Sequence, residues 1–244
     1  MTSTPLKPWL ENVQLHPDVL SDAFSEDIFA LDLGPLADCL LAEELRLSTK
    51  DLPAVPAVYR DPEHFFRASY LTTGLRALLA DALDRLGGGP GNRILKLVTA
   101  FGGGKSHTLA ALLHAARSRK SLDLIPEGRG LPEPGRVRVA VFDGQFFDAK
   151  TGKAVPGPST GSGQALRART MWGWIAWSLG GTKGYEMLRE QDEARVAPGA
   201  DALLPLLKEG PNLILLDEVL EYLNSAGGVK AEKTTLRDET LSFL

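Results

Sequence analysis

The stretch TAFGGGKS, residues 99–106, follows the short β-type run RILKLV (93–98) and opens the helix-forming run KSHTLAALLHAARSRK (105–120). This order of strand, glycine-rich loop and helix is typical of a phosphate-binding loop. Glycines allow successive backbone N–H groups to turn toward a pyrophosphate without a Cβ in the way. The stretch therefore predicts a nucleotide-binding domain in which a strand leads into the loop.

The side chains of this loop have distinct expected roles. Lys105 is placed to reach the β- and γ-phosphates, the Ser106 hydroxyl is a Mg²⁺ ligand, and the helix that begins at Lys105 directs its positive end at the phosphates. The strict motif has glycine where this chain has Thr99, so the entry to the loop differs from the common form. We expect the nucleotide to contact Thr99, Phe101, Gly102, Gly103, Gly104, Lys105, Ser106 and His107, although packing is the simpler role for His107.

A second stretch, LILLDE (213–218), has the pattern of a central parallel strand that ends in two carboxylates. Asp217 is expected to hold Mg²⁺ through water beside Ser106. Glu218 is then placed to polarise an attacking water as a general base. Strands that end in a polar turn are common, so this stretch has predictive value mainly together with the upstream loop.

A dinucleotide fold is not supported, because Gly102-x-Gly104 has His107 where the third glycine belongs.

The alternation of strands and helices predicts an α/β P-loop NTPase of the AAA type, with a parallel sheet flanked by helices. We expect a helical lead-in over residues 1–60, split by Gly34-Pro35, and a P-loop ATPase core over 61–244. The chain ends within an element, so the core is expected to be truncated at its C-terminus. The expected strands are 93–98, 136–142 and 212–216, the expected helices are 61–86, 105–120, 165–179 and 200–208, and a surface loop is expected over 148–163.

Composition limits the classes of protein that fit. Lysine and arginine number 27 against 31 acidic residues, and the net charge of −4 argues against a dedicated nucleic-acid-coating module. Cys39 is the only cysteine, so an intrachain disulfide is excluded, and its apolar neighbours predict burial. No segment approaches the roughly 18 consecutive apolar residues of a membrane span. We therefore expect a soluble, cytoplasmic protein without a membrane partner.

Weaker signals have mostly structural explanations. The tryptophans at 172, 174 and 177 are expected in the core rather than stacked on bases. The basic cluster 117–120 closes a helix, where cations favour the negative end of the dipole. Asp143 and Gln145 follow the second expected strand and are candidates for sensing the γ-phosphate, although nothing in the sequence fixes that role.

Four segments in this order resemble a prokaryotic family of large AAA-type P-loop ATPases encoded in phage-defence islands, similar to the ATPase of phage-growth-limitation and exclusion systems. They are 7–19 (KPWLENVQLHPDV), 59–86, 99–114 and 213–223 (LILLDEVLEYL). The resemblance implies ATP and Mg²⁺ as ligands, with Lys105, Ser106, Asp217 and Glu218 in the Walker roles, and Thr99 belongs to the TxFGGGK form of this family. It also implies an oligomer or larger complex formed through regions beyond this chain, and DNA as a partner. No segment matches the arginine finger or the second sensor.

The expected activity is Mg²⁺-dependent ATP hydrolysis by in-line attack of water, with Lys105 and Mg²⁺ offsetting the developing charge and Glu218 orienting the water. Two other functions fit the same motifs. One is a regulatory module that holds ATP and hydrolyses little of it. The other is a small-molecule P-loop phosphotransferase, which requires an acceptor pocket and a lid.

Overall fold

A computed structural model describes residues 8, 31–47, 50, 52–98, 103–156 and 166–244. The chain divides into two units, Met1–Leu31 and Asp32–Leu244, and the architecture below is that of the second unit. Its elements are α3 (Leu33–Glu44), α4 (Ala57–Arg60), α5 (Pro62–Ala68), α6 (Thr73–Leu86), α7 (Lys105–Arg117), the 3-10 helices η2 (Arg119–Leu124) and η3 (Pro126–Gly128), β1 (Arg138–Asp143), β2 (Lys153–Ala154), β3 (Arg167–Ala168), α8 (Met171–Ala194), α9 (Ala200–Leu207), β4 (Asn212–Asp217), α10 (Val219–Ala226) and α11 (Leu236–Phe243).

A small parallel sheet lies at the centre of the unit. Strands β1 and β4 pair in parallel, in a register that sets Arg138 opposite Asn212 and Asp143 opposite Asp217. Both strands therefore end at the same edge, each on an aspartate. The short strands β2 and β3 form a separate antiparallel pair. The expected strands at 136–142 and 212–216 are confirmed: each ends one residue later than expected, and the first also begins two residues later.

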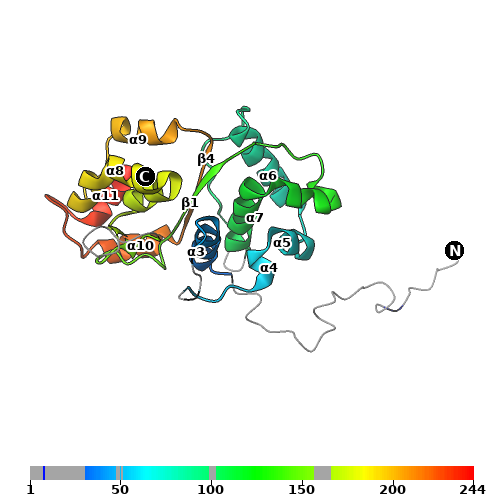
Figure 1. Ribbon diagram of the computed structural model, residues 1–244, viewed down its shortest axis with the longest axis horizontal. Helices are drawn as coiled ribbons and strands as arrows, with labels where there is room; N and C mark the ends of the chain where they lie inside the picture. Colours follow the sequence, from blue (N-terminus) through cyan, green and yellow to red (C-terminus); the bar gives the residue numbers. More distant parts are fainter. Residues whose placement is uncertain (1–7, 9–30, 48–49, 51, 99–102, 157–165) are drawn as a thin grey trace, which may run out of the picture. The chain divides into compact units, whose positions relative to one another are not determined.

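Helices flank the sheet on both sides. Figure 1 shows α4 to α7 on one side of β1 and β4, and α8 to α11 on the other. The second group surrounds a core of aromatic side chains in which Trp172, Phe142 and Tyr222 have no exposed surface. Trp174 and Trp177 are 3% and 5% exposed. The prediction that the tryptophans belong to the core is confirmed.

Local sequence explains where the helices near the candidate site begin. The Asp61 carboxylate accepts the backbone N–H groups of Glu63 and His64, at 2.7 and 2.9 Å, and Pro62 occupies the first turn of α5. The Thr72 hydroxyl caps α6 in the same way, so the expected single helix over 61–86 is two helices. Helix α7 begins after Gly104, whose positive φ of 72° favours glycine.

The structure corrects two other expectations and leaves a third open. Helix α8 begins at Met171, six residues after the expected start, and it continues across a kink at Gly181 to Ala194. Gly34 and Pro35 lie in the first turn of α3, where a proline is tolerated because its missing N–H has no intrahelical partner. The helix expected before them falls on residues outside the described ones, so the split there stays a prediction. Of the expected loop at 148–163, residues 157–163 lie outside the described residues, and residues 153–154 form β2.

The expected strand at 93–98 is wrong. These residues are described, and they form neither a strand nor a helix. Ile94 is 88% exposed and Val98 is 78% exposed, so their side chains contribute little to the core. A β-strand requires a hydrogen-bonded neighbour, and within the described ranges β4 pairs only with β1. The apolar pattern of RILKLV is therefore not enough to define a strand here.

Candidate functional site

The described part of the glycine loop ends at a helix N-terminus. Gly104 has the left-handed conformation (φ 72°, ψ 28°), no atom lies within 4 Å of the position that a Cβ would take there, and α7 follows at Lys105. The first N–H groups of a helix have no intrahelical partner, and the helix dipole adds positive potential there. The Lys105 side chain is half-buried, and none of the described residues forms an ion pair or hydrogen bond with its ammonium group. Such a helix start offers N–H donors and one cation to a phosphate group.

The second motif lies at the same place. The Ser106 hydroxyl donates a hydrogen bond to the Asp217 carboxylate, with 3.3 Å between Oγ and Oδ2, across 111 residues of sequence. Asp217 is 7% exposed and ends β4. The predicted metal ligands Ser106 and Asp217 are therefore neighbours, as expected. No cluster of three or more His, Cys, Asp or Glu side chains suited to a metal exists among the residues described.

Glu218 has an unusual backbone. Its φ of 46° and ψ of 34° are left-handed, and it is the N-cap of α10. The left-handed region is unfavourable for a residue with a Cβ, and such strain is often found at functional sites. The side chain is exposed, and its carboxylate makes no hydrogen bond or ion pair with any described residue. The predicted general base is thus held by its backbone alone.

Asp143 connects the end of β1 to α3. Its Oδ2 accepts the backbone N–H of Gly34 at 2.9 Å, and its Oδ1 accepts that of Gln145 at 3.0 Å. Burial raises the pKa of Asp143, and the nearby Asp217 carboxylate raises it further, against the lowering effect of these two N–H donors. A Cβ on Gly34 would lie 3.1 Å from the Asp143 Cβ. The Asp143 carboxylate therefore binds the start of α3 to the end of β1, beside the candidate site. Gln145 is exposed, and a role for either residue in sensing a γ-phosphate stays a prediction.

His107, in the first turn of α7, has the packing role that the sequence favoured over a phosphate contact. Its ring stacks on Phe65 of α5, with 4.8 Å between the ring centroids. Burial lowers its pKa. Two turns further along α7, His114 also contacts α5, with 5.0 Å between the centroids of its ring and that of Phe65. Two histidines and one phenylalanine therefore fix α7 against α5.

His114 is a buried neutral histidine. Its Nε2 donates to the Tyr59 carbonyl at 2.7 Å, because a carbonyl oxygen can only accept. Burial lowers its pKa to about 4, and the Arg117 charge lowers it too, against the raising effects of the Tyr59 carbonyl and Asp61. An unfolded histidine titrates near pH 6.5. The unfolded chain therefore binds the proton more readily between these two values, and the folded state loses stability as the pH falls from about 6.5 toward 4.

The difference between the His114 pKa values of the folded and unfolded chain predicts a fold that loses stability in acid. Between pH 7 and pH 5 the His114 contribution to the free energy of unfolding should fall by about 2 kcal/mol. Urea denaturation of the wild type and of His114→Gln at both pH values measures it, and the pH dependence should shrink in the variant. His64→Gln, at an exposed position of α5, is the control and should keep it. An equal pH dependence in the wild type and His114→Gln would refute the assignment.

The structure brings most of the predicted site together. Gly103, Gly104, Lys105 and Ser106 lie at the start of α7, while Asp217 and Glu218 lie at the end of β4, and the Ser106–Asp217 hydrogen bond joins the two groups. Thr99, Phe101 and Gly102 lie outside the described residues. Sequence reasoning did not assign Gly34 or Gly144 to the site, where a Cβ on Gly34 would crowd the Asp143 side chain and a Cβ on Gly144 would crowd the Glu218 backbone. An aspartate-glycine pair directly after a buried strand, Asp143-Gly144, was the available signal.

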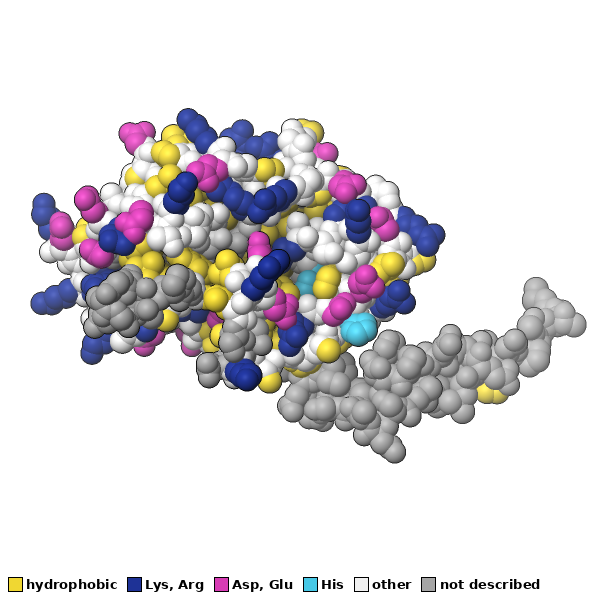
Figure 2. Space-filling view, in the orientation of Figure 1, with side chains coloured by type: hydrophobic (Ala, Val, Ile, Leu, Met, Phe, Trp, Pro, Cys, Tyr) yellow, Lys and Arg dark blue, Asp and Glu magenta, His cyan; other side chains and the backbone are white. Residues whose placement is uncertain are grey.

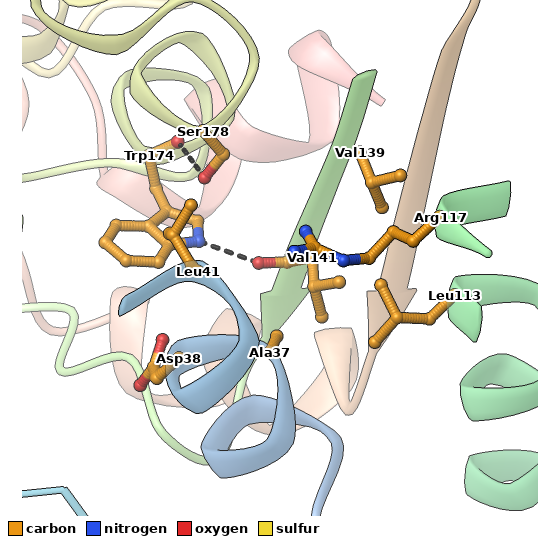
Figure 3. Close-up of a pocket in the computed structure, with 9 residues that line it drawn as sticks. All are labelled: Ala37, Asp38, Leu41, Leu113, Arg117, Val139, Val141, Trp174 and Ser178. Atoms are coloured by element: carbon orange, nitrogen blue, oxygen red, sulfur yellow. Dashed lines mark hydrogen bonds between the residues drawn. The ribbon is translucent and has the colours of Figure 1, made fainter. Parts of the chain in front are cut away.

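A pocket beside β1 includes none of the predicted site residues. It lies where α3, α7 and α8 meet, and Figure 3 shows the Trp174 indole donating to the Val141 carbonyl, at 2.7 Å from Nε1 to O. Its charged groups already have partners, since Asp38 pairs with Lys153 at 2.8 Å and Arg117 with Glu44 at 2.9 Å. Because the charged groups of the pocket are paired and the Trp174 N–H is bonded to β1, we interpret the pocket as a packing gap.

A comparison with protein-family models matches residues 44–244 to the model described as the DUF499 N-terminal domain. The chain belongs to the DUF499 N-terminal domain family. The matched region contains the glycine loop, the Asp217-Glu218 pair and both strands of the parallel sheet. Comparisons with curated proteins and with solved structures found no significant match. Membership in the DUF499 N-terminal domain family does not by itself assign an activity to these residues.

Other surface features of this DUF499 domain are ordinary. Figure 2 shows basic and acidic side chains mixed across the visible face. In the 117–120 cluster, Arg117 pairs with Glu44, and Arg119 pairs with Asp123 and donates to the Leu131 carbonyl. Cys39 is 3% exposed, as expected. None of the described helices is long and apolar enough to cross a membrane.

Proposed function

We propose that this protein binds Mg·ATP at the start of α7 and the end of β4, as a P-loop NTPase of the AAA type. The observation that carries the proposal is the hydrogen bond between Ser106 and Asp217, because it joins the two predicted motifs at one strand end. The N–H groups that open α7 and the unpaired Lys105 ammonium would hold the phosphates. Ser106 would bind the Mg²⁺ ion directly, and Asp217 would bind it through water.

Hydrolysis is the second part of the proposal. Glu218 lies one residue beyond Asp217, is exposed, and has no partner among the described residues that would neutralise its carboxylate. In this position it would orient a water molecule for in-line attack on the γ-phosphate. A module that holds ATP without turnover remains the alternative. It is distinguished by single-turnover measurements, in which a regulatory module would bind ATP and leave it intact.

The biological setting of this activity is also a proposal, and it comes from the resemblance to AAA-type ATPases of phage-defence islands. On that basis we place the protein in the cytoplasm, as part of an oligomer or larger assembly that acts on or near DNA. The net charge of −4 gives DNA binding no independent support. The ATP site can be tested without reference to this setting.

Calorimetry tests the site directly. Mg·ATP titrated into the folded chain should bind with a Kd between about 1 μM and 1 mM, the range in which enzymes usually have their KM values. Binding should weaken when EDTA removes Mg²⁺. Adenosine should not bind measurably at the same concentrations, because the phosphates supply the contacts. A folded chain that binds Mg·ATP no better than adenosine would contradict the proposal.

A further inference from the structure

The turn that follows β1 lies against the backbone of Glu218. Gly144 comes directly after Asp143, and its N–H donates to the Asp217 carbonyl at 3.0 Å, which extends the parallel ladder by one step. A Cβ on Gly144 would lie 2.1 Å from the Glu218 carbonyl oxygen and 2.8 Å from its carbonyl carbon. Real Cβ atoms essentially never come within 3.0 Å of such atoms. Gly144 does not have a positive φ, so the close approach alone excludes a side chain here.

The crowded atoms have little room to move. They belong to the backbone of Glu218, and the third close atom is the Tyr222 Cβ at 3.0 Å. Tyr222 has no exposed surface, and its ring packs edge-on against Phe142 of β1, with 5.0 Å between the centroids. Helix α10 is therefore anchored to β1 one turn beyond Glu218. Interiors packed in this way transmit a displacement and do not absorb it.

Backbone position decides where the Glu218 carboxylate lies. The residue has a left-handed φ of 46°, and no described residue bonds to its carboxylate. Such a conformation persists only where the surroundings determine it. The surroundings here are Gly144 on one side and Asp217 on the other. The Asp217 carbonyl accepts the Gly144 N–H, and its Oδ1 accepts the Glu218 N–H at 3.1 Å.

We propose that Gly144 is a positioning residue for Glu218: its missing side chain lets the backbone at 217–218 take the conformation that aims the Glu218 carboxylate at the attacking water. This inference rests on the proposed ATP hydrolysis. A methyl group at position 144 would push the Glu218 carbonyl away and turn its side chain. It would leave in place the Lys105 ammonium and the N–H groups that open α7, which bind the phosphates.

Gly144→Ala tests this inference, with Gly74→Ala as the matched control. Gly74 lies in α6 without a positive φ, and no atom is within 4 Å of the position that a Cβ would take there. In Gly144→Ala the Kd for Mg·ATP should stay within about threefold of the wild type, while single-turnover hydrolysis should slow by about 100-fold, the scale of a 1 Å misplacement. In a Glu218→Gln background the same change should slow hydrolysis less than about threefold further. Gly74→Ala should match the wild type throughout.

The outcomes separate the inference from the proposed function. No Mg·ATP binding by the wild type would contradict the ATP site itself. Wild-type hydrolysis with an unchanged rate in Gly144→Ala, or an equal slowing in both Glu218 backgrounds, would overturn the positioning role. If Gly144→Ala does not fold, Gly144→Ala/Glu218→Gly decides, because glycine at 218 widens the backbone freedom that the methyl group removes. If the double variant folds, the result would support the close contact between position 144 and the backbone of residue 218. If it does not fold, the result would overturn the inference drawn from that contact.

Discussion

Replacing Lys105 by alanine should weaken Mg·ATP binding about 30- to 150-fold. A hydrogen bond from an ammonium to a phosphate contributes about 2–3 kcal/mol, and each 1.4 kcal/mol corresponds to tenfold in Kd. Lys105 opens α7 and has no partner among the described side chains, so its removal costs the folded chain no ion pair. The loss should therefore appear in nucleotide affinity while the free energy of unfolding changes little. Calorimetry and urea denaturation measure the two quantities on the same preparation.

The control for this variant is Lys120→Ala. Lys120 is exposed and lies beyond the opposite end of α7, in η2. It should bind Mg·ATP like the wild type, which excludes a general effect of lost positive charge. Lys105→Arg should retain part of the affinity, because it keeps the charge and changes the geometry. Equal affinities for Lys105→Ala and the wild type would mean that the phosphates bind elsewhere.

The sequence predicted the two motifs and the two paired strands because these features are local. Asp61-Pro62, the glycines before Lys105 and the apolar run before Asp217 each act through their own backbone neighbourhood. The same locality explains the failure at 93–98. A run such as RILKLV has the composition of a strand, yet pairing depends on a neighbour that its own sequence does not encode.

Contacts between distant segments were beyond the reach of sequence patterns. Gly34 and Asp143 are 109 residues apart, and only the fold shows that an N–H at the start of α3 meets a carboxylate at the end of β1. The left-handed backbone of Glu218 was equally hidden, because glutamate is not a residue type that favours it. Both features lie beside the Ser106–Asp217 contact, so the local geometry of the candidate site was among the parts of the fold that the sequence did not predict.

Glu218→Gln should slow single-turnover ATP hydrolysis about 100- to 1,000-fold and leave Mg·ATP affinity within about threefold of the wild type. The amide has nearly the same shape as the carboxylate, but it cannot accept a proton from water, and general-base catalysis is worth roughly 100- to 10,000-fold. The substitution should not affect folding, since the Glu218 side chain is exposed and makes no hydrogen bond to the described residues. Quenched-flow measurement with the protein in excess over ATP isolates the chemical step.

Glu221→Gln is the matched control for this prediction, because Glu221 is an exposed glutamate in the first turn of the same helix. It should hydrolyse ATP at the wild-type rate. A wild type that binds ATP without turnover would instead favour the regulatory module, with Glu218 in a role other than catalysis. If the wild type hydrolyses ATP and Glu218→Gln does so at the same rate, the general base must be a group other than Glu218. Asp143 is a poor candidate for that role, because its two carboxylate oxygens already accept the N–H groups of Gly34 and Gln145.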